Sequence, residues 1–235
     1  MSQQTIPQHI AIICDGNRRW AKARGLEVFM GHKKATDEVF ESLVIHCISR
    51  GVKYLTFWIF STENWKRDKR EVDFLMNLFR DFFDTRITDM DKKGVRVKVI
   101  GDITQFASDI QERIVRGTKD TENNTSLTLV LAMNYGGRDE LRRAVQAIAA
   151  KVEDGELQSS DISEKEISSH LDTNFMPEPE IIVRTGGEQR LSGFMLWQCN
   201  YTEFMFPEWT FPEFSPERLD EVIAEFNHRQ RRFGG

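Results

Sequence analysis

The chain has 235 residues, of which 40% are hydrophobic and 29% charged, and its formal net charge is −5. This length suffices for one large α/β domain, and the acidic balance argues against nucleic-acid binding, which favours a basic surface. The sequence has no run of 18 apolar residues, and its N-terminus lacks a signal-peptide pattern. We therefore expect a cytoplasmic protein whose three cysteines, Cys14, Cys47 and Cys199, stay reduced.

Strand-like and helix-like segments alternate along the chain. Apolar runs bounded by turn residues predict strands at 9–14, 54–60, 95–101, 127–132 and 180–184. Helical spacing of apolar residues predicts helices at about 34–50, 71–92, 104–123, 138–152, 163–171 and 216–231. This order favours a single α/β domain over residues 1–235, with a mainly parallel central sheet of about six strands flanked by helices.

Polar segments follow four of these strands, and the carboxyl ends of parallel strands bind ligands at one edge of a sheet. The segments are DGNRRW, STENWKR, MNYGGR and RTGGEQRLS. They carry glycines and the arginines Arg18, Arg19, Arg67, Arg138, Arg184 and Arg190. Arginine grips phosphate oxygens with two parallel hydrogen bonds, and glycine lets backbone N–H groups approach an anion. The alternative is a set of solvated arginines paired with nearby acids.

The phosphate chemistry is not that of a common nucleotide site. Neither a GxxxxGK[ST] motif nor a GxGxxG motif after the first strand occurs. The pattern therefore predicts a diphosphate pocket. Asp15, at a strand end, suits a divalent cation that needs only one or two carboxylates besides phosphate oxygens, and Glu203 is a second candidate. The alternative for Asp15 is capping of its own turn, and His32 either donates to a phosphate or merely lies near a helix start.

The segment EVDFLMNLFRDFF carries two apolar stripes at helical spacing. One comprises Val72, Leu75, Met76, Phe79 and Phe83; the other comprises Phe74, Leu78 and Phe82. The first stripe is expected to pack on the sheet. The second either meets a neighbouring helix or lines a tunnel for a lipid tail. A diphosphate pocket above an apolar channel suggests an isoprenoid diphosphate as the ligand.

Four blocks of the sequence resemble, in order and spacing, those of the cis-prenyltransferases of the bacterial undecaprenyl diphosphate synthase (isoprenyl transferase) branch. They are HIAIICDGNRRWAK, FSTENWKR, NYGGRDEL and RTGGEQRLSGFMLWQCNYTEF, and a terminal RRFGG extends the likeness. The resemblance implies a homodimer, a Mg²⁺-dependent reaction and a hydrophobic tunnel between sheet and helices. The implied substrates are isopentenyl diphosphate and an allylic diphosphate of the farnesyl or geranyl type. The implied product is a cis-polyprenyl diphosphate of the kind that carries cell-wall precursors, released with peripheral membrane contact.

The resemblance also assigns roles to residues. Asp15 matches the essential aspartate that acts with Mg²⁺, Glu203 a second metal-associated carboxylate, and Asn64 the residue at the proton-transfer step. Gly16, Asn17, Arg18 and Arg19 match the loop that binds the allylic diphosphate in the family. Trp20 and His32 match residues next to that loop. A mobile loop matches Ser61, Thr62, Glu63, Asn64, Trp65 and Arg67. The isopentenyl diphosphate site matches Arg184, Arg190, Leu191 and Ser192. Arg232 and Gly234 match a C-terminal motif that, in the family, reaches the active site of the other subunit.

Several positions depart from the family pattern. Arg18 stands where bacterial members usually have glycine, and Val28 where an arginine commonly holds the allylic diphosphate. The predicted tunnel residues are Ile59, Leu75, Leu78, Phe79 and Phe82. Ile59 and Phe82 occupy positions where alanine occurs in long-chain members, which predicts shorter products unless neighbouring residues compensate. The alternatives are a short-chain Z-prenyl diphosphate synthase, or a non-catalytic lipid-binding subunit, which would be expected to lack Asp15 and Asn64.

Overall fold

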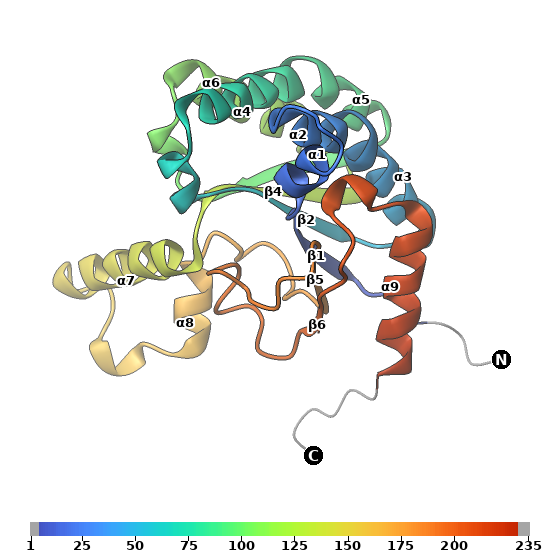
Figure 1. Cartoon of the computed structure of the whole chain (residues 1–235). Helices are drawn as coiled ribbons and strands as arrows, with labels where there is room; N and C mark the ends of the chain where they lie inside the picture. The colour runs from blue at the N-terminus through green and yellow to red at the C-terminus, as the bar shows by residue number, and fades with distance from the viewer. Residues whose placement is uncertain (1–4, 230–235) are drawn as a thin grey trace.

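A computed structural model describes residues 5–229 and contains one six-stranded, entirely parallel sheet in the order β3-β4-β2-β1-β5-β6 (Figure 1). The strands are β1 (His9–Ile13), β2 (Tyr54–Ser61), β3 (Val95–Ile100), β4 (Leu127–Tyr135), β5 (Ile181–Arg184) and β6 (Glu203–Met205). The predicted parallel sheet is confirmed, and so are the five predicted strands. The sixth, β6, has only three residues, too few for a recognisable pattern.

Nine α-helices surround the sheet in the described part of the chain. They are α1 (Asn17–Lys22), α2 (Phe29–Lys34), α3 (Phe40–Arg50), α4 (Lys69–Asp81), α5 (Ile87–Lys92), α6 (Ser108–Asp120), α7 (Gly137–Glu153), α8 (Glu164–Ser169) and α9 (Pro216–His228). π-Helical turns at Ala35–Val39 and Phe82–Arg86 join α2 to α3 and α4 to α5. The helix predicted from residue 34 therefore begins at Phe29, and the short α1 was not predicted.

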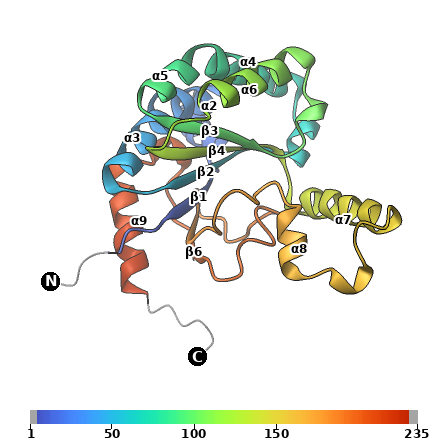
Figure 2. The ribbon, with the colours of Figure 1, turned by 180° about the vertical axis from the view of Figure 1, so that it is seen from behind.

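Alternate residues of the buried strands face opposite layers. Ile10 and Ile12 pack in the larger core with α3, α4, α6 and α9, whereas Ala11 and Ile13 pack in a smaller core with Phe194. Figures 1 and 2 show α1 to α6 on one side of the sheet, and α7, α8 and the segment after β5 on the other. Because both faces are covered, these strands are almost continuously apolar.

In β2, the alternation of side chains between the two faces of the sheet is interrupted at Ile59. Trp58 pairs with Ala132 and Phe60 with Met133, so Ile59 has no opposite residue in β4. This β-bulge turns both Ile59 and Phe60 toward the larger core. A bulge commonly redirects a side chain beside a functional site, and here it adds a side chain to one face.

The three cysteines are free thiols, as expected. Burial raises the pKa of the Cys47 thiol, and burial together with the Asp15 charge raises the pKa of Cys14. In residues 5–229 we find no helix that combines the length and the apolar character needed to cross a bilayer.

His9, at the start of β1, is completely buried. Its Nδ1 lies 2.8 Å from the Pro177 carbonyl oxygen, which can only accept, so Nδ1 carries the proton. Nε2 then accepts from the Thr56 hydroxyl, 2.8 Å away. Burial lowers the pKa of His9 from 6.5 to about 4, so the folded protein keeps this ring neutral.

We expect this histidine to make the protein less stable as the pH falls from 6.5 to 4. The unfolded chain takes up a proton in this range and the folded chain does not, which costs about 3 kcal/mol of unfolding free energy. The measurement compares wild type with His9→Asn from pH 7 to pH 4. The difference in unfolding free energy between wild type and His9→Asn should shrink toward acid pH. The prediction is wrong if this difference stays constant with pH. It is also wrong if the difference between wild type and the control His228→Asn, an exposed position, shrinks by the same amount.

Candidate active site

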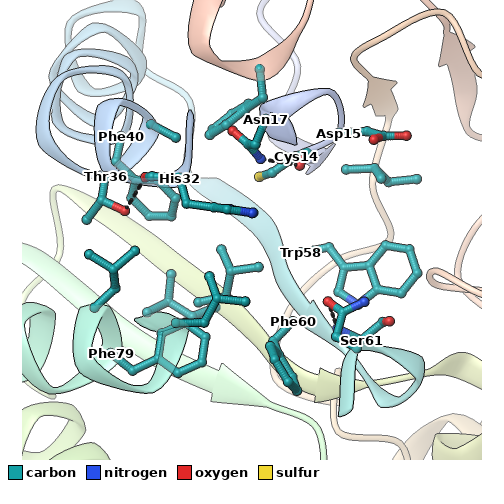
Figure 3. Close-up of a pocket in the computed structure, with 18 of the residues that line it drawn as sticks. Cys14, Asp15, Asn17, His32, Thr36, Phe40, Trp58, Phe60, Ser61 and Phe79 are labelled. Carbon is teal, nitrogen blue, oxygen red and sulfur yellow. Dashed lines mark hydrogen bonds between the residues drawn. The ribbon is translucent and has the colours of Figure 1, made fainter. Parts of the chain in front are cut away.

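Two adjoining hollows lie beyond the carboxyl ends of β1, β2 and β5, the edge of the sheet predicted from the polar segments. The apolar cavity, of about 230 Å³, runs between β2 and α4. The basic pocket, of about 310 Å³, lies beside α1. The two share Cys14, Asp15, Asn17, His32 and Arg67 in their walls. Figure 3 shows Asp15, Asn17 and His32 on one side of the apolar cavity, with Phe60 and Phe79 across from them.

All five residues predicted to line a tunnel lie in the wall of the apolar cavity. They are Ile59, Leu75, Leu78, Phe79 and Phe82. Phe40, Phe60, Phe83 and Phe211 complete an aromatic lining. The second apolar stripe of α4 therefore divides: Leu78 and Phe82 face the cavity, whereas Phe74 packs on Phe29 with ring centroids 4.9 Å apart.

The basic pocket is lined by four cationic side chains, Arg18, Arg19, Lys22 and Arg67, together with the Asp15 carboxylate. Gly16, the residue before α1, has φ 94°, a left-handed conformation that favours glycine. Gly31 allows α2 to pack on the backbone of α1, because a Cβ there would collide with the Asn17 carbonyl. The pocket is therefore built to receive an anion.

Two polar atoms at the shared wall have no hydrogen-bond partner among the described residues. Asn17 Oδ1 and His32 Nε2 are both buried, although Asn17 Nδ2 donates to the Cys14 carbonyl at 2.9 Å. Buried polar atoms are rarely left unpaired, so such atoms commonly indicate where a ligand or water binds. Both lie where the basic pocket meets the apolar cavity.

Asp15 forms an ion pair with Arg184, which comes from the end of the neighbouring strand β5. Arg184 Nη2 and Nε donate to Asp15 Oδ2 at 2.9 and 3.3 Å, and Gly16 N–H donates to Oδ1 at 2.6 Å. The remaining amino group of Arg184, Nη1, donates to the Arg190 carbonyl at 2.6 Å and to Ser192 Oγ at 2.7 Å. Arg184 thus holds the segment after β5 against the strand end of β1.

The predicted isopentenyl diphosphate residues lie in different places. Ser192 lines the apolar cavity with φ 54°, an uncommon conformation for a residue other than glycine. The Arg190 side chain is exposed and forms an ion pair with Glu188, and Glu188 lies 3.8 Å from Arg19. Leu191 packs in the smaller core. Arg184 and Ser192 therefore line the cavity, whereas Arg190 lines neither hollow.

Glu71, in the first turn of α4, is a site residue that the sequence analysis missed. It is 9% exposed, accepts from Arg67 Nη1 at 2.9 Å, and lies 3.8 Å from Arg18 Nε and 3.5 Å from His32 Nε2. The His32 contact falls short of hydrogen-bond geometry. His32, Arg67 and Arg18 hold the pKa of Glu71 below its usual value, although burial raises it. Its spacing of four from Arg67 was the available signal.

The segment after β2 forms a 3-10 turn, Thr62–Lys66, that places Asn64 in the cavity wall. Asn64 Oδ1 accepts from Ser61 N–H at 3.1 Å, which fixes its amide. Ser61 also lines the cavity, whereas Thr62, Glu63 and Trp65 do not. The Trp65 ring instead packs against Phe60 and Phe106, with centroids 4.9 and 5.4 Å away.

Some of the residues predicted at the site lie elsewhere in the structure or outside the described residues. Trp20 lies outside both hollows, with the Arg24 guanidinium 4.5 Å from its ring centroid. Glu203 pairs with Ile181, which pairs with Ile10, so it lies five residues, roughly 15 Å, from Asp15 along the strand direction. It forms an ion pair with Arg229 at 2.9 Å. A metal ion shared by Asp15 and Glu203 would thus require a second chain. Arg232 and Gly234 lie outside the described residues.

The metal-ligating side chains at the site suit a cation that binds together with the substrate. No group of three or more histidine, cysteine or acidic side chains able to hold a metal occurs in residues 5–229. Mg²⁺, however, is usually bound by one or two carboxylates together with phosphate oxygens and water. Asp15, a carboxylate at the junction of two hollows beside arginines, fits that mode.

This fold and site define a protein for ligands that combine an anionic head with an apolar body. The prenyltransferase family described as "Putative undecaprenyl diphosphate synthase" matches residues 13–234. The chain is 44% identical over 230 residues to ditrans,polycis-undecaprenyl-diphosphate synthase ((2E,6E)-farnesyl-diphosphate specific) of Micrococcus luteus, covering 98% of this chain and 92% of the relative. It belongs to this family of prenyl-transferring enzymes, as the resemblance predicted.

Two further relatives support this assignment to the family. The isoprenyl transferase of Clostridium perfringens is 43% identical over 233 residues, covering 99% of this chain and 92% of the relative. The crystal structure of lavandulyl diphosphate synthase from Lavandula x intermedia, in complex with dimethylallyl diphosphate, superposes with a TM-score of 0.94 at 37% identity. That match covers 97% of this chain and 98% of the other. Relatives with these names support cis-prenyl chain elongation as the general activity.

Proposed function

We propose that the protein condenses isopentenyl diphosphate with an allylic diphosphate of the farnesyl or geranyl type to give a cis-polyprenyl diphosphate, and that it requires Mg²⁺. The proposal rests on the shared wall of the basic pocket and the apolar cavity, which includes Asp15. A diphosphate head and a prenyl tail of one molecule fit these two environments.

Each diphosphate has its own group of residues. Arg18, Arg19 and Arg67 bind the allylic diphosphate in the basic pocket, with the unpaired Asn17 and His32 atoms beside it. Arg184, Ser192 and Arg190 bind the diphosphate of isopentenyl diphosphate next to them. Asp15 lies between the groups, and Mg²⁺ bound there with phosphate oxygens would neutralise the charge of the departing diphosphate.

The reaction needs charge stabilisation and a dry channel. The allylic C–O bond breaks and leaves its electron pair on the diphosphate, where fixed arginines stabilise the growing charge. The isopentenyl double bond supplies the pair for the new C–C bond. A proton then leaves, and its bonding pair becomes the new cis double bond. A diphosphate oxygen takes up that proton, and Asn64, fixed by Ser61, orients the groups at this step. Aromatic side chains exclude water from the cationic carbon.

Arg18 is proposed to supply the charge that Val28 does not. Its guanidinium is half-exposed and lies in the basic pocket beside Glu71. We expect Arg18→Gly to raise the KM for the allylic diphosphate several-fold, and Val28→Arg added to it to restore part of the loss. Steady-state kinetics with Arg24→Gly, which alters an arginine outside both hollows, provides the control. Unchanged allylic kinetics in Arg18→Gly would show that Arg18 is a solvated surface charge.

A second candidate is a synthase that stops after one or a few additions. The bulky Ile59 and Phe82 in the cavity wall favour it, as does the likeness to a structure that holds dimethylallyl diphosphate. We further propose a homodimer that works in the cytoplasm and contacts the membrane peripherally as its apolar product leaves.

The test is incubation with radiolabelled isopentenyl diphosphate, Mg²⁺ and dimethylallyl, geranyl or farnesyl diphosphate, followed by sizing of the products. A ladder of prenyl products, absent when Mg²⁺ is chelated, supports the proposal. Products that end after one or two additions identify the short-chain candidate. If no primer is extended while the allylic diphosphate still binds, the protein is a lipid-binding subunit and the proposed reaction is wrong.

A further inference from the structure

Asn134 has an unusual backbone for a residue inside a central strand. Phe60 pairs with Met133 and Ser61 with Tyr135, so Asn134 has no opposite residue in β2. Its φ of 47° is left-handed, although it is not glycine, and the side chain is completely buried. Such a conformation persists only where surrounding contacts impose it, and it is concentrated at functional positions. Asparagine is among the few residue types that adopt it.

The Asn134 side chain uses both ends of its amide. Oδ1 accepts from Trp65 Nε1–H at 2.9 Å, and Nδ2 donates to the Asp102 carbonyl at 2.8 Å. The indole N–H can only donate and a carbonyl can only accept, so these contacts fix which way the amide points. Asn134 therefore connects the 3-10 turn after β2 to the segment after β3.

In the sequence, Trp65 stands between two residues of the active site, Asn64 and Arg67. Asn64, its neighbour in the chain, lines the cavity with its amide fixed by Ser61. Arg67, two residues later, lines both hollows and is bound to Glu71. The Trp65 ring packs against Phe60 and Phe106, whose side chains carry no oxygen or nitrogen that could accept from the indole N–H. The hydrogen bond to Asn134 gives the indole N–H its acceptor and adds a directional contact to this packing.

We propose that Asn134 is a positioning residue for the reaction: its amide fixes Trp65 and thereby holds Asn64 and Arg67 at the cavity. The kinetic part of this inference rests on the proposed function, whereas the structural part does not. Because a small displacement of catalytic groups lowers turnover strongly, the loss of this hydrogen bond should reduce kcat more than it changes KM.

The test uses two substitutions that remove the hydrogen bond from opposite sides. Asn134→Gly keeps a residue suited to the left-handed backbone and removes the amide; Trp65→Phe keeps an aromatic ring and removes the N–H. We expect each to lower kcat about tenfold, and the double variant to be no slower than the slower single one, as for two residues of one contact. Trp197→Phe, which removes an indole hydrogen bond to Ser168, is the matched control and should leave kcat unchanged.

Hydrogen–deuterium exchange of residues 61–68 gives a reading that needs no substrate. Exchange should quicken in Asn134→Gly and in Trp65→Phe and stay unchanged in Trp197→Phe. Normal exchange and kcat in both single variants, or effects that multiply in the double variant, overturn the inference. If wild type extends no primer, the proposed function fails, and exchange alone decides whether Asn134 holds the turn. If Asn134→Gly does not fold, Trp65→Phe decides.

Discussion

Replacing Asp15 by asparagine should lower kcat for prenyl transfer at least about a hundredfold while the protein stays folded. The carboxylate lies where the basic pocket meets the apolar cavity, and it is the acid in the basic pocket's wall. Asparagine has the same shape and can still accept from Arg184, but it carries no charge with which to bind Mg²⁺. The interaction lost is one that strengthens as the diphosphate departs, so turnover falls more than substrate binding does.

The measurement is steady-state kinetics together with thermal unfolding of the same samples. A modest loss of stability is expected, because Arg184 is 6% exposed and loses an ionic acceptor. Asp154→Asn, at the exposed end of α7, makes the same chemical change away from both hollows and should match wild type. If Asp15→Asn kept more than a tenth of wild-type kcat, Asp15 would be only a structural partner of Arg184.

Enlarging the apolar cavity at Ile59 and Phe82 should lengthen the products by one or more isoprene units. Ile59 faces the cavity because of the bulge in β2, and Phe82 faces it from the π-helical turn after α4. The Phe82 ring packs near Phe83 and Phe40, at centroid distances of 5.2 and 6.3 Å. A tightly packed wall does not yield to a growing chain, so side-chain bulk limits its length.

Product sizing of wild type, Ile59→Ala, Phe82→Ala and the double variant tests this limit. Each substitution also costs about 2–5 kcal/mol of stability if the cavity does not collapse, so the assay is run well below the unfolding temperature. Ile48→Ala and Phe226→Ala remove the same side chains elsewhere in the core and should leave product length unchanged. A wild type that already makes C55, with no change in the variants, would mean that neighbouring residues compensate for the bulk.

Part of this architecture could be predicted because it depends on short spacings along the chain. Apolar runs such as Ile10–Ile13 predict buried strands, and alternation with helical patterns predicts a parallel sheet. In such a sheet the residues after each strand must meet at one edge, so Asp15 and Arg184 were expected near each other before any contact was known. Helical spacing predicted the two apolar stripes of α4 but left open whether the second met a neighbouring helix or a tunnel; the structure places Leu78 and Phe82 in the cavity wall.

Other features were decided only by tertiary structure. The bulges at Ile59 and Asn134 arise from a mismatch between two strands far apart in the sequence, and neither strand alone contains it. Glu71 became a site residue because α1 and α2 bring Arg18 and His32 to the start of α4. Glu203 lies far from Asp15 because β6 pairs in a register that three residues cannot reveal. Patterns of two to four residues determine local structure and which face is buried; the register between strands and the contacts between helices depend on packing of the whole chain.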